Sequence, residues 1–216
     1  MRNNIYLDEK IKYIRDTFIK EDDILKKIKE DARKINREIN INPEEGKLLQ
    51  ILIKLGNFKK IMEIGTFFGY STIWLARATD KDAKIYTVER DKESIEKAKN
   101  NFKSAELEDK IVVLEGDAKD ILGNLNEEFD MIFIDAEKNH YLDYLDWAEK
   151  NLKHGGLLIA DNTLLSGAVC SEELPYRIRK STKESMEIFN KRLADDKKYL
   201  SILLPAEDGM TIALKK

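Results

Sequence analysis

The chain has 216 residues, of which 42% are hydrophobic and 37% are charged, and its formal net charge at pH 7 is −3. This length and composition predict one globular domain, residues 1–216, and exclude a chain that is disordered throughout. The near balance of 38 basic and 41 acidic residues excludes a strongly basic nucleic-acid binder, but it does not exclude a local basic patch.

The content of cysteine and histidine limits the metal chemistry. The single cysteine, Cys170, excludes an internal disulfide framework and a cysteine-based zinc site. Two histidines, His140 and His154, are too few for a histidine-rich site, so any metal must be held mainly by oxygen, as Mg²⁺, Ca²⁺ and Mn²⁺ are. The charged N-terminus and the absence of a long apolar run predict a cytoplasmic protein without a signal peptide or membrane span.

The N-terminal region predicts helices. Apolar residues recur at helical spacing from Leu7 to Ile39. We expect residues 1–40 to form a helical cover on the domain, and the alternative is that the helical region 8–39 is a dimer face. Asn42 and Pro43, followed by two glutamates, predict the start of a further helix that runs to Gly56.

From residue 60 onward, short apolar runs alternate with amphipathic helices. The runs are 61–64, 85–88, 111–114, 131–134 and 157–160, and the helices include 71–78, 92–103 and 140–152. This order predicts a mostly parallel sheet with helices on both faces. Two late strands, 201–204 and 211–214, flank the turn Glu207-Asp208-Gly209 and predict an antiparallel hairpin. The expected fold is therefore a doubly wound, Rossmann-like α/β domain with a seven-stranded sheet.

The end of the first strand carries a glycine turn with the spacing GxxxG, from Gly65 to Gly69, preceded by the acid Glu63. This spacing fits neither a dinucleotide fingerprint nor a P-loop. The second strand ends in Glu89, at the place where an acid accepts hydrogen bonds from ribose hydroxyls. An acid at both places favours a cationic nucleoside without a pyrophosphate as the ligand. S-adenosylmethionine fits this description, because it combines adenosine with a positively charged sulfonium. The alternative is a turn that only joins strand to helix.

Acids also follow the later strands. Asp117 stands where a polar group can reach an adenine edge, or where it caps the next helix. Asp135 and the pair Asp161-Asn162 follow two strands that are expected to be neighbours. Two carboxylates and an amide oxygen make a plausible Mg²⁺ site, and the alternative is helix capping or solvent exposure.

Several segments together resemble the metal-dependent O-methyltransferases of the catechol and caffeoyl-CoA type. They are EIGTFFGYSTIWLA, YTVERD, GDA, FDMIFIDAEKNHY and GGLLIADN, and the resemblance covers roughly residues 36 to 216. Within that group, NTLLSGAV and the ending LPAEDGMTIALKK are most similar to the bacterial tRNA 5-hydroxyuridine methyltransferases.

The resemblance implies specific residue roles. The donor S-adenosylmethionine would contact Ile41, Glu63, Gly65, Gly69, Tyr70, Ser71, Glu89, Asp117, Ala118 and Asp135. Mg²⁺ or another divalent ion would be held by Asp135, Asp161 and Asn162, and Asp135 and Lys138 would be catalytic. Lys138 matches a residue thought to act as base in the catechol enzymes, and the alternative is a lysine at the rim of the site.

The acceptor is expected to be 5-hydroxyuridine at the tRNA wobble position, which would become 5-methoxyuridine. A small catechol-like or phenolic acceptor is the alternative, because both offer two adjacent oxygens to one metal ion. Tyr176, Arg177 and Arg179 are candidate RNA contacts in a basic segment that could equally be a solvated helix face. The net charge of −3 is mild evidence against a tRNA acceptor. A nucleotide- or RNA-binding module without catalysis is a third possibility. We also expect a homodimer and no membrane partner.

Overall fold

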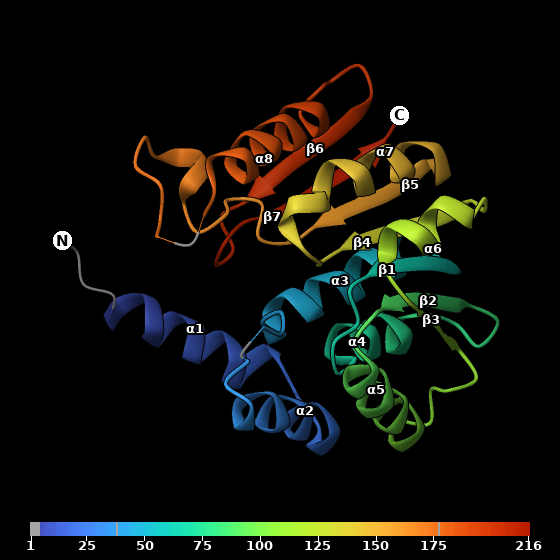
Figure 1. Ribbon diagram of the computed structural model, residues 1–216. Helices are drawn as coiled ribbons and strands as arrows, with labels where there is room; N and C mark the ends of the chain where they lie inside the picture. Colours follow the sequence, from blue (N-terminus) through green and yellow to red (C-terminus); the bar gives the residue numbers. More distant parts are fainter. Residues whose placement is uncertain (1–4, 38, 177) are drawn as a thin grey trace.

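The computed structural model describes residues 5–37, 39–176 and 178–216 (Figure 1). The helices are α1 (Ile5–Phe18), α2 (Asp23–Lys34), α3 (Pro43–Gly56), α4 (Tyr70–Ala78), α5 (Lys92–Ser104), α6 (Ala118–Asn124), α7 (Tyr141–Asn151) and α8 (Lys180–Leu193), with short 3₁₀ turns η1 (Lys138–His140) and η2 (Ala168–Cys170). The strands are β1 (Lys60–Ile64), β2 (Lys84–Glu89), β3 (Ile111–Glu115), β4 (Phe129–Ile134), β5 (Leu152–Ala160), β6 (Tyr199–Leu204) and β7 (Met210–Lys215).

These strands form one seven-stranded sheet in the order β3-β2-β1-β4-β5-β7-β6. The first five strands of this order pair in parallel, and β7 lies antiparallel to both β5 and β6. The predicted doubly wound fold with an antiparallel hairpin is confirmed. The strand order reverses between β1 and β4, and in sheets of this kind ligands bind at the carboxyl ends of the strands beside that reversal.

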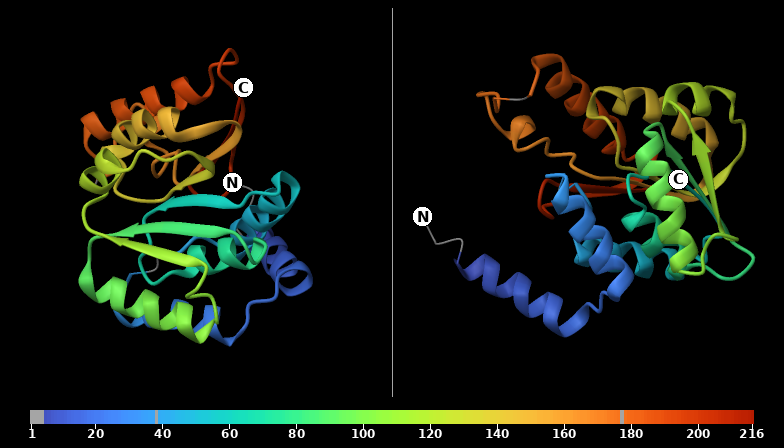
Figure 2. Two further views of the ribbon diagram at one scale, coloured as in Figure 1. Left: turned by 90° about the vertical axis from the view of Figure 1, so that its right-hand side faces the viewer. Right: turned by 60° about the horizontal axis from the view of Figure 1, so that its bottom comes forward.

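Two hydrophobic clusters hold helices against the two faces of the sheet. Buried side chains of α3, α4 and α5 pack on one face, and those of α6, α7 and α8 pack on the other. Figure 2 shows these layers from two further directions. Burial on both faces explains why the central strands are continuous apolar runs rather than alternating ones.

The N-terminal helices lie outside the first helix layer. Leu25, Ile28 and Ala32 of α2 are fully buried against the cluster that covers α4 and α5. In Figure 1, α1 extends away from the sheet, and its Arg15 reaches Glu44 at the start of α3. Among the described residues, the structure contains no helix that is long and apolar enough to cross a membrane.

Helix α3 starts as its sequence predicts. Pro43 occupies the first turn, and the Glu45 carboxylate accepts a hydrogen bond of 2.7 Å from the backbone N–H of Asn42. This bond satisfies one of the donors that every helix start leaves free. Glu45 is only 3% exposed, and its Oε1 atom has no hydrogen-bond partner among the described residues.

Candidate active site

A cavity of about 1020 Å³ opens at the carboxyl ends of the parallel strands. Its wall contains these residues that the sequence singles out: Ile41, Gly65, Ser71, Glu89, Asp117, Ala118, Asp135, Lys138, Asp161 and Asn162. All of these residues except Ile41 follow strands of the parallel part of the sheet, and the cavity forms because that sheet brings its strand ends to one edge.

Gly65 stands where the ends of β1 and β4 come closest. Its φ of +105° lies in the left-handed region, and a Cβ on it would lie 2.0 Å from the carbonyl oxygen of Asp135. Only glycine accommodates both the conformation and the close approach. Gly65 therefore fixes the distance between the glycine turn and the loop that begins at Asp135.

Glu63 lies beneath this turn rather than in the cavity wall. Its side chain is fully buried and accepts hydrogen bonds from Thr72 at 2.5 Å and from Thr87 at 2.7 Å. Burial raises the pKa of Glu63 to about 7, and hydroxyl hydrogen bonds limit that rise. Its neighbour in this network, Ser71, does line the cavity.

Backbone N–H groups orient Glu89 at the end of β2. One carboxylate oxygen accepts from Phe67 at 2.8 Å, and the other accepts from Arg90 and Asp91 at 2.9 Å each. These bonds use about three of the four acceptor positions of a carboxylate, so about one stays free for a ligand hydroxyl. Asp117 caps α6 through the N–H of Lys119 at 2.9 Å and also lines the cavity. The position of Asp117 is thus compatible with both predicted roles, a cap of the next helix and a contact to the adenine edge.

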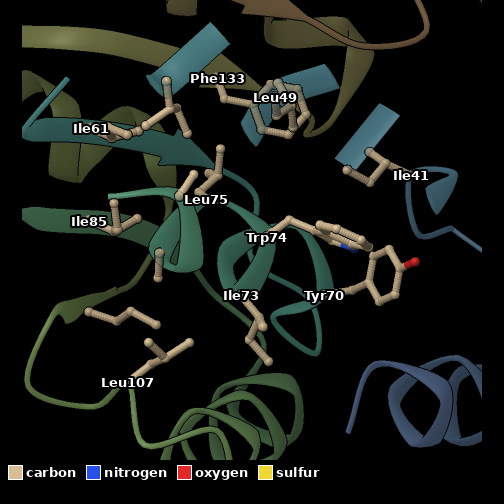
Figure 3. Close-up of a cluster of buried hydrophobic side chains, with 14 of the residues drawn as sticks. Ile41, Leu49, Ile61, Tyr70, Ile73, Trp74, Leu75, Ile85, Leu107 and Phe133 are labelled. Atoms are coloured by element: carbon tan, nitrogen blue, oxygen red, sulfur yellow. The ribbon is translucent and has the colours of Figure 1, made fainter. Parts of the chain in front are cut away.

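Besides Glu63, two further predicted donor contacts, Gly69 and Tyr70, are not among the described residues of the cavity wall. A Cβ on Gly69 would lie 2.3 Å from the ring of Phe102, so the space beside it is filled by α5. Tyr70 is buried, and its hydroxyl donates a hydrogen bond of 2.6 Å to Glu21. Figure 3 shows the Tyr70 ring beside Trp74 in the hydrophobic cluster, with a centroid separation of 6.3 Å. The first turn of α4 directs Tyr70 toward the N-terminal helices.

The other end of the cavity contains the acids that follow β4 and β5. Ile134 and Ala160 pair in register, so Asp135 and Asp161 leave adjacent strands at the same level. Asp161 is 5% exposed, and one of its oxygens accepts a hydrogen bond of 2.8 Å from the N–H of Asn162. Burial and the nearby negative charge of Asp135 raise the pKa of Asp161 to about 7. The charge of Asp135 is therefore close enough to disfavour the ionisation of Asp161.

The chemistry of this donor set fits a divalent cation. The second oxygens of Asp135 and Asp161 accept no hydrogen bond from the described residues, and the Asn162 side chain makes none with them. Two carboxylates and an amide oxygen are ligands that Mg²⁺ accepts. Within the described ranges there is no group of three or more His, Cys, Asp or Glu side chains that could hold a metal, so Asn162 is needed as the third ligand.

Lys138 lies between these acids and a buried tyrosine. Its Nζ atom is 3.2 Å from Asp135 and donates to the Tyr141 hydroxyl at 2.7 Å. The Tyr141 hydroxyl in turn donates to the backbone oxygen of Asp161 at 2.8 Å. Burial lowers the pKa of Lys138, but Tyr141 and the two carboxylates raise it more, and the net shift is upward. In this arrangement Lys138 is the counter-ion of the acids.

Sequence reasoning missed part of the wall beyond β5. Leu164, Leu165 and Ser166 line the cavity, as do Glu207 and Asp208 of the β6–β7 turn. Backbone hydrogen bonds join the two segments, from Leu164 to Asp208 at 2.8 Å and from Thr163 to Gly209 at 2.9 Å. The turn sequence Glu207-Asp208-Gly209 was the only signal, and it predicts a hairpin without showing what the hairpin faces.

The basic segment contacts the described wall through Ile178, which lines the cavity. Tyr176 and Arg179 are exposed, and neither is among the described residues that line the cavity. Arg177 lies outside the described residues. The structure thus brings together the strand-end residues but does not place Tyr176 or Arg179 in the described wall.

Comparisons with known proteins agree with this fold. The family model described as O-methyltransferase matches residues 15–216. A catechol O-methyltransferase from Niastella koreensis is 35% identical over 220 residues, which cover 99% of this chain and 100% of the relative. A caffeoyl-CoA O-methyltransferase from Eucalyptus gunnii is 36% identical over 216 residues, which cover 95% of this chain and 86% of the relative.

Solved structures give the same result. The O-methyltransferase TomG from Streptomyces achromogenes, which is involved in tomaymycin synthesis and was solved in complex with SAM, has a TM-score of 0.89 at 31% identity over 100% of both chains. An O-methyltransferase from Bacillus cereus in complex with SAH has a TM-score of 0.84 at 30% identity over 95% of this chain and 96% of that one. The chain therefore belongs to the O-methyltransferase family.

Proposed function

We propose that this chain transfers the methyl group of S-adenosylmethionine to one hydroxyl of a small catechol-like diphenol. The observation that carries the proposal is a single cavity with two chemically different ends. We call the part formed by Gly65, Glu89, Asp117 and Ala118 the β2 end. We call the part formed by Lys138, Asp161, Asn162, residues 164–167, Glu207 and Asp208 the β5 end.

The β2 end suits the donor. Glu89 keeps an acceptor position for a ribose hydroxyl, and the backbone of the Gly65 turn comes close to the cavity without a side chain in between. Two relatives, TomG and the Bacillus cereus enzyme, were solved with SAM and SAH respectively. Since these relatives share the fold along nearly the whole chain, they support the same donor here.

The β5 end suits an acceptor with two adjacent oxygens. In the proposed reaction a phenolic oxygen attacks the methyl carbon, the C–O bond forms as the C–S bond breaks, and sulfur keeps the electron pair. A divalent cation at Asp135, Asp161 and Asn162 would supply the positive charge that favours the ionised hydroxyl. The position of Lys138 keeps its Nζ atom beside this site, and its role as the base that takes the phenolic proton stays a prediction.

The choice of a small acceptor over tRNA depends on the relatives and on the wall of the cavity. Two of the relatives described above, from Niastella koreensis and Eucalyptus gunnii, are named for catechol and caffeoyl-CoA respectively. Tyr176 and Arg179 do not line the described wall. The 5-hydroxyl and 4-carbonyl of 5-hydroxyuridine also offer two adjacent oxygens, so tRNA that carries this base stays the second acceptor to test.

The test is transfer of labelled methyl groups from S-adenosylmethionine to 4-ethylcatechol and to 5-hydroxyuridine tRNA in parallel reactions. We expect label in the catechol and a loss of transfer in excess chelator. Label in the tRNA alone would reverse the choice of acceptor, and full transfer in chelator would refute the metal role.

A further inference from the structure

The β5 end of the cavity is bounded by an acidic turn that is held in place from two sides. Asp208 accepts a hydrogen bond of 2.6 Å from the N–H of Ser166, which fixes the turn against the loop after β5. Gly209 allows this approach, since a Cβ on it would lie 2.5 Å from the side chain of Leu164. The acids of the turn are therefore part of the wall rather than an unattached surface loop.

Glu207 is oriented from the other side by the start of α3. The Asn42 side chain donates a hydrogen bond to the Glu207 carboxylate. The amide oxygen of Asn42 in turn accepts from Arg15 at 2.9 Å. Arg15 makes two further bonds of 2.9 Å to Glu44, so its positive charge already has a partner. The side chain that donates directly to Glu207 is therefore the neutral amide of Asn42 rather than the charged Arg15.

The basic residues of the wall lie mostly at the other end. Arg90 pairs with Asp117 and Glu137 at 3.5 and 3.2 Å. The positive charge of Arg37 lies close enough to Asp91 to favour its ionised carboxylate. Among the described lining residues, Lys138 is the one basic side chain at the β5 end, and Asp135 is its partner at 3.2 Å. In the described wall, the space that would hold the rest of an acceptor is therefore bordered by Glu207 and Asp208, and the basic side chain at this end, Lys138, is already paired with Asp135.

We propose that Glu207, supported by Asp208, selects acceptors by charge, favouring diphenols with a protonated amine on the side chain over diphenols on an anionic carrier. This inference rests on the proposed function. A CoA thioester brings several phosphate charges, and an anionic ligand of this kind needs Arg or Lys partners. The effect of one unit charge a few ångströms away in water-like surroundings is roughly fivefold in affinity, and salt reduces it.

The experiment compares three catechols of matched size with the full chain, S-adenosylmethionine and Mg²⁺. They are 2-(3,4-dihydroxyphenyl)ethylamine, neutral 4-ethylcatechol and 3-(3,4-dihydroxyphenyl)propionate, with caffeoyl-CoA as the most anionic acceptor. We expect kcat/KM to decrease in this order. The ratio between amine and carboxylate should approach one as NaCl is raised, because Glu207 is exposed to solvent.

Glu207→Gln keeps an oxygen that accepts from Asn42 and removes the charge. Since that charge attracts the amine and repels the carboxylate, about fivefold each, we expect the ratio between amine and carboxylate to fall by up to roughly 25-fold, mainly through KM. Asp208→Asn should also lower the ratio of kcat/KM between amine and carboxylate. The control is Glu93→Gln on α5, whose side chain is 72% exposed, and it should leave the ratio as in the wild type.

The outcomes separate this inference from the proposed function. Turnover of 4-ethylcatechol with a wild-type ratio near one, or a ratio that neither variant changes, overturns the inference and leaves the function standing. Efficient methylation of caffeoyl-CoA also overturns it. If none of these diphenols is methylated, the proposed function fails and the inference fails with it.

Discussion

The backbone of Gly65 and the carbonyl oxygen of Asp135 approach so closely that a Cβ on Gly65 would lie 2.0 Å from that oxygen. This approach joins the two halves of the candidate site, because Gly65 begins the turn after β1 and Asp135 begins the loop after β4. A single atom added here must therefore separate the strands that define the cavity.

Gly65→Ala should destabilise the fold and weaken donor binding together. Steric overlap with Asp135 adds to the strain of a left-handed backbone, and we expect a loss of at least about 2 kcal/mol in the free energy of unfolding. Urea denaturation and calorimetric titration with S-adenosylhomocysteine measure the two effects. The control is Gly123→Ala in α6, where a Cβ meets nothing within 4 Å. A Gly65→Ala variant with the wild-type free energy of unfolding and the wild-type affinity for S-adenosylhomocysteine would contradict the role of this contact.

Glu89→Gln should weaken donor binding about 10- to 100-fold, since hydrogen bonds to a charged group contribute about 1.5–3 kcal/mol. The same three backbone N–H groups would lose a charged acceptor, so the variant also reports on the rigidity of the Phe67 turn. Glu115→Gln is a matched control, because Glu115 pairs with Glu89 in register at the end of β3. Equal donor affinity in the two variants would count against a ribose contact at Glu89.

The sequence predicts the sheet and the strand-end acids for one physical reason. Parallel strands buried on both faces require continuous apolar runs, and their carboxyl ends meet at one edge. That rule places Asp135 beside Asp161 without any coordinates. It does not extend to Tyr70, because the orientation of the first turn of α4 depends on where the distant α2 region and its Glu21 pack. The place of Glu207 in the cavity wall could not be predicted either, because its neighbours come from the start of α3 and the loop after β5.

Glu45 makes the stability of the protein depend on pH. Burial and the nearby charge of Asp161 raise the pKa of Glu45 from 4.5 to about 8. Between these pH values the folded state binds more protons than the unfolded state does. The stability linked to Glu45 is therefore fully present below pH 4.5 and is lost as the pH rises to about 8. Each unit of the shift corresponds to about 1.4 kcal/mol.

Glu45→Gln should remove this loss while it keeps an oxygen for the N–H of Asn42. We expect the variant to gain several kcal/mol relative to the wild type between pH 5 and pH 9, measured by urea denaturation in chelator. Glu93→Gln, on the solvent side of α5, should follow the wild type. A parallel pH dependence of Glu45→Gln and the wild type would show that Glu45 ionises normally.

Asp161→Asn should lower kcat/KM at least about 100-fold, because the charge stabilisation supplied by a bound cation is worth several kcal/mol. Binding of Mn²⁺, followed by electron paramagnetic resonance, should be lost as well. Binding of S-adenosylhomocysteine should change little, since the donor is expected at the β2 end. Asp208→Asn is the control for Mn²⁺ binding, and a variant at Asp161 that binds Mn²⁺ as the wild type does would refute the proposed ligand set.

The most direct measurement is a crystal structure with S-adenosylhomocysteine, Mg²⁺ and a tight-binding nitrocatechol. We expect the ribose beside Glu89, the cation on Asp135, Asp161 and Asn162, and one phenolic oxygen facing the sulfur across a gap that a methyl group fills. A nitrocatechol bound outside the cavity, or donor and acceptor at separate sites, would contradict the claim that one cavity performs the transfer.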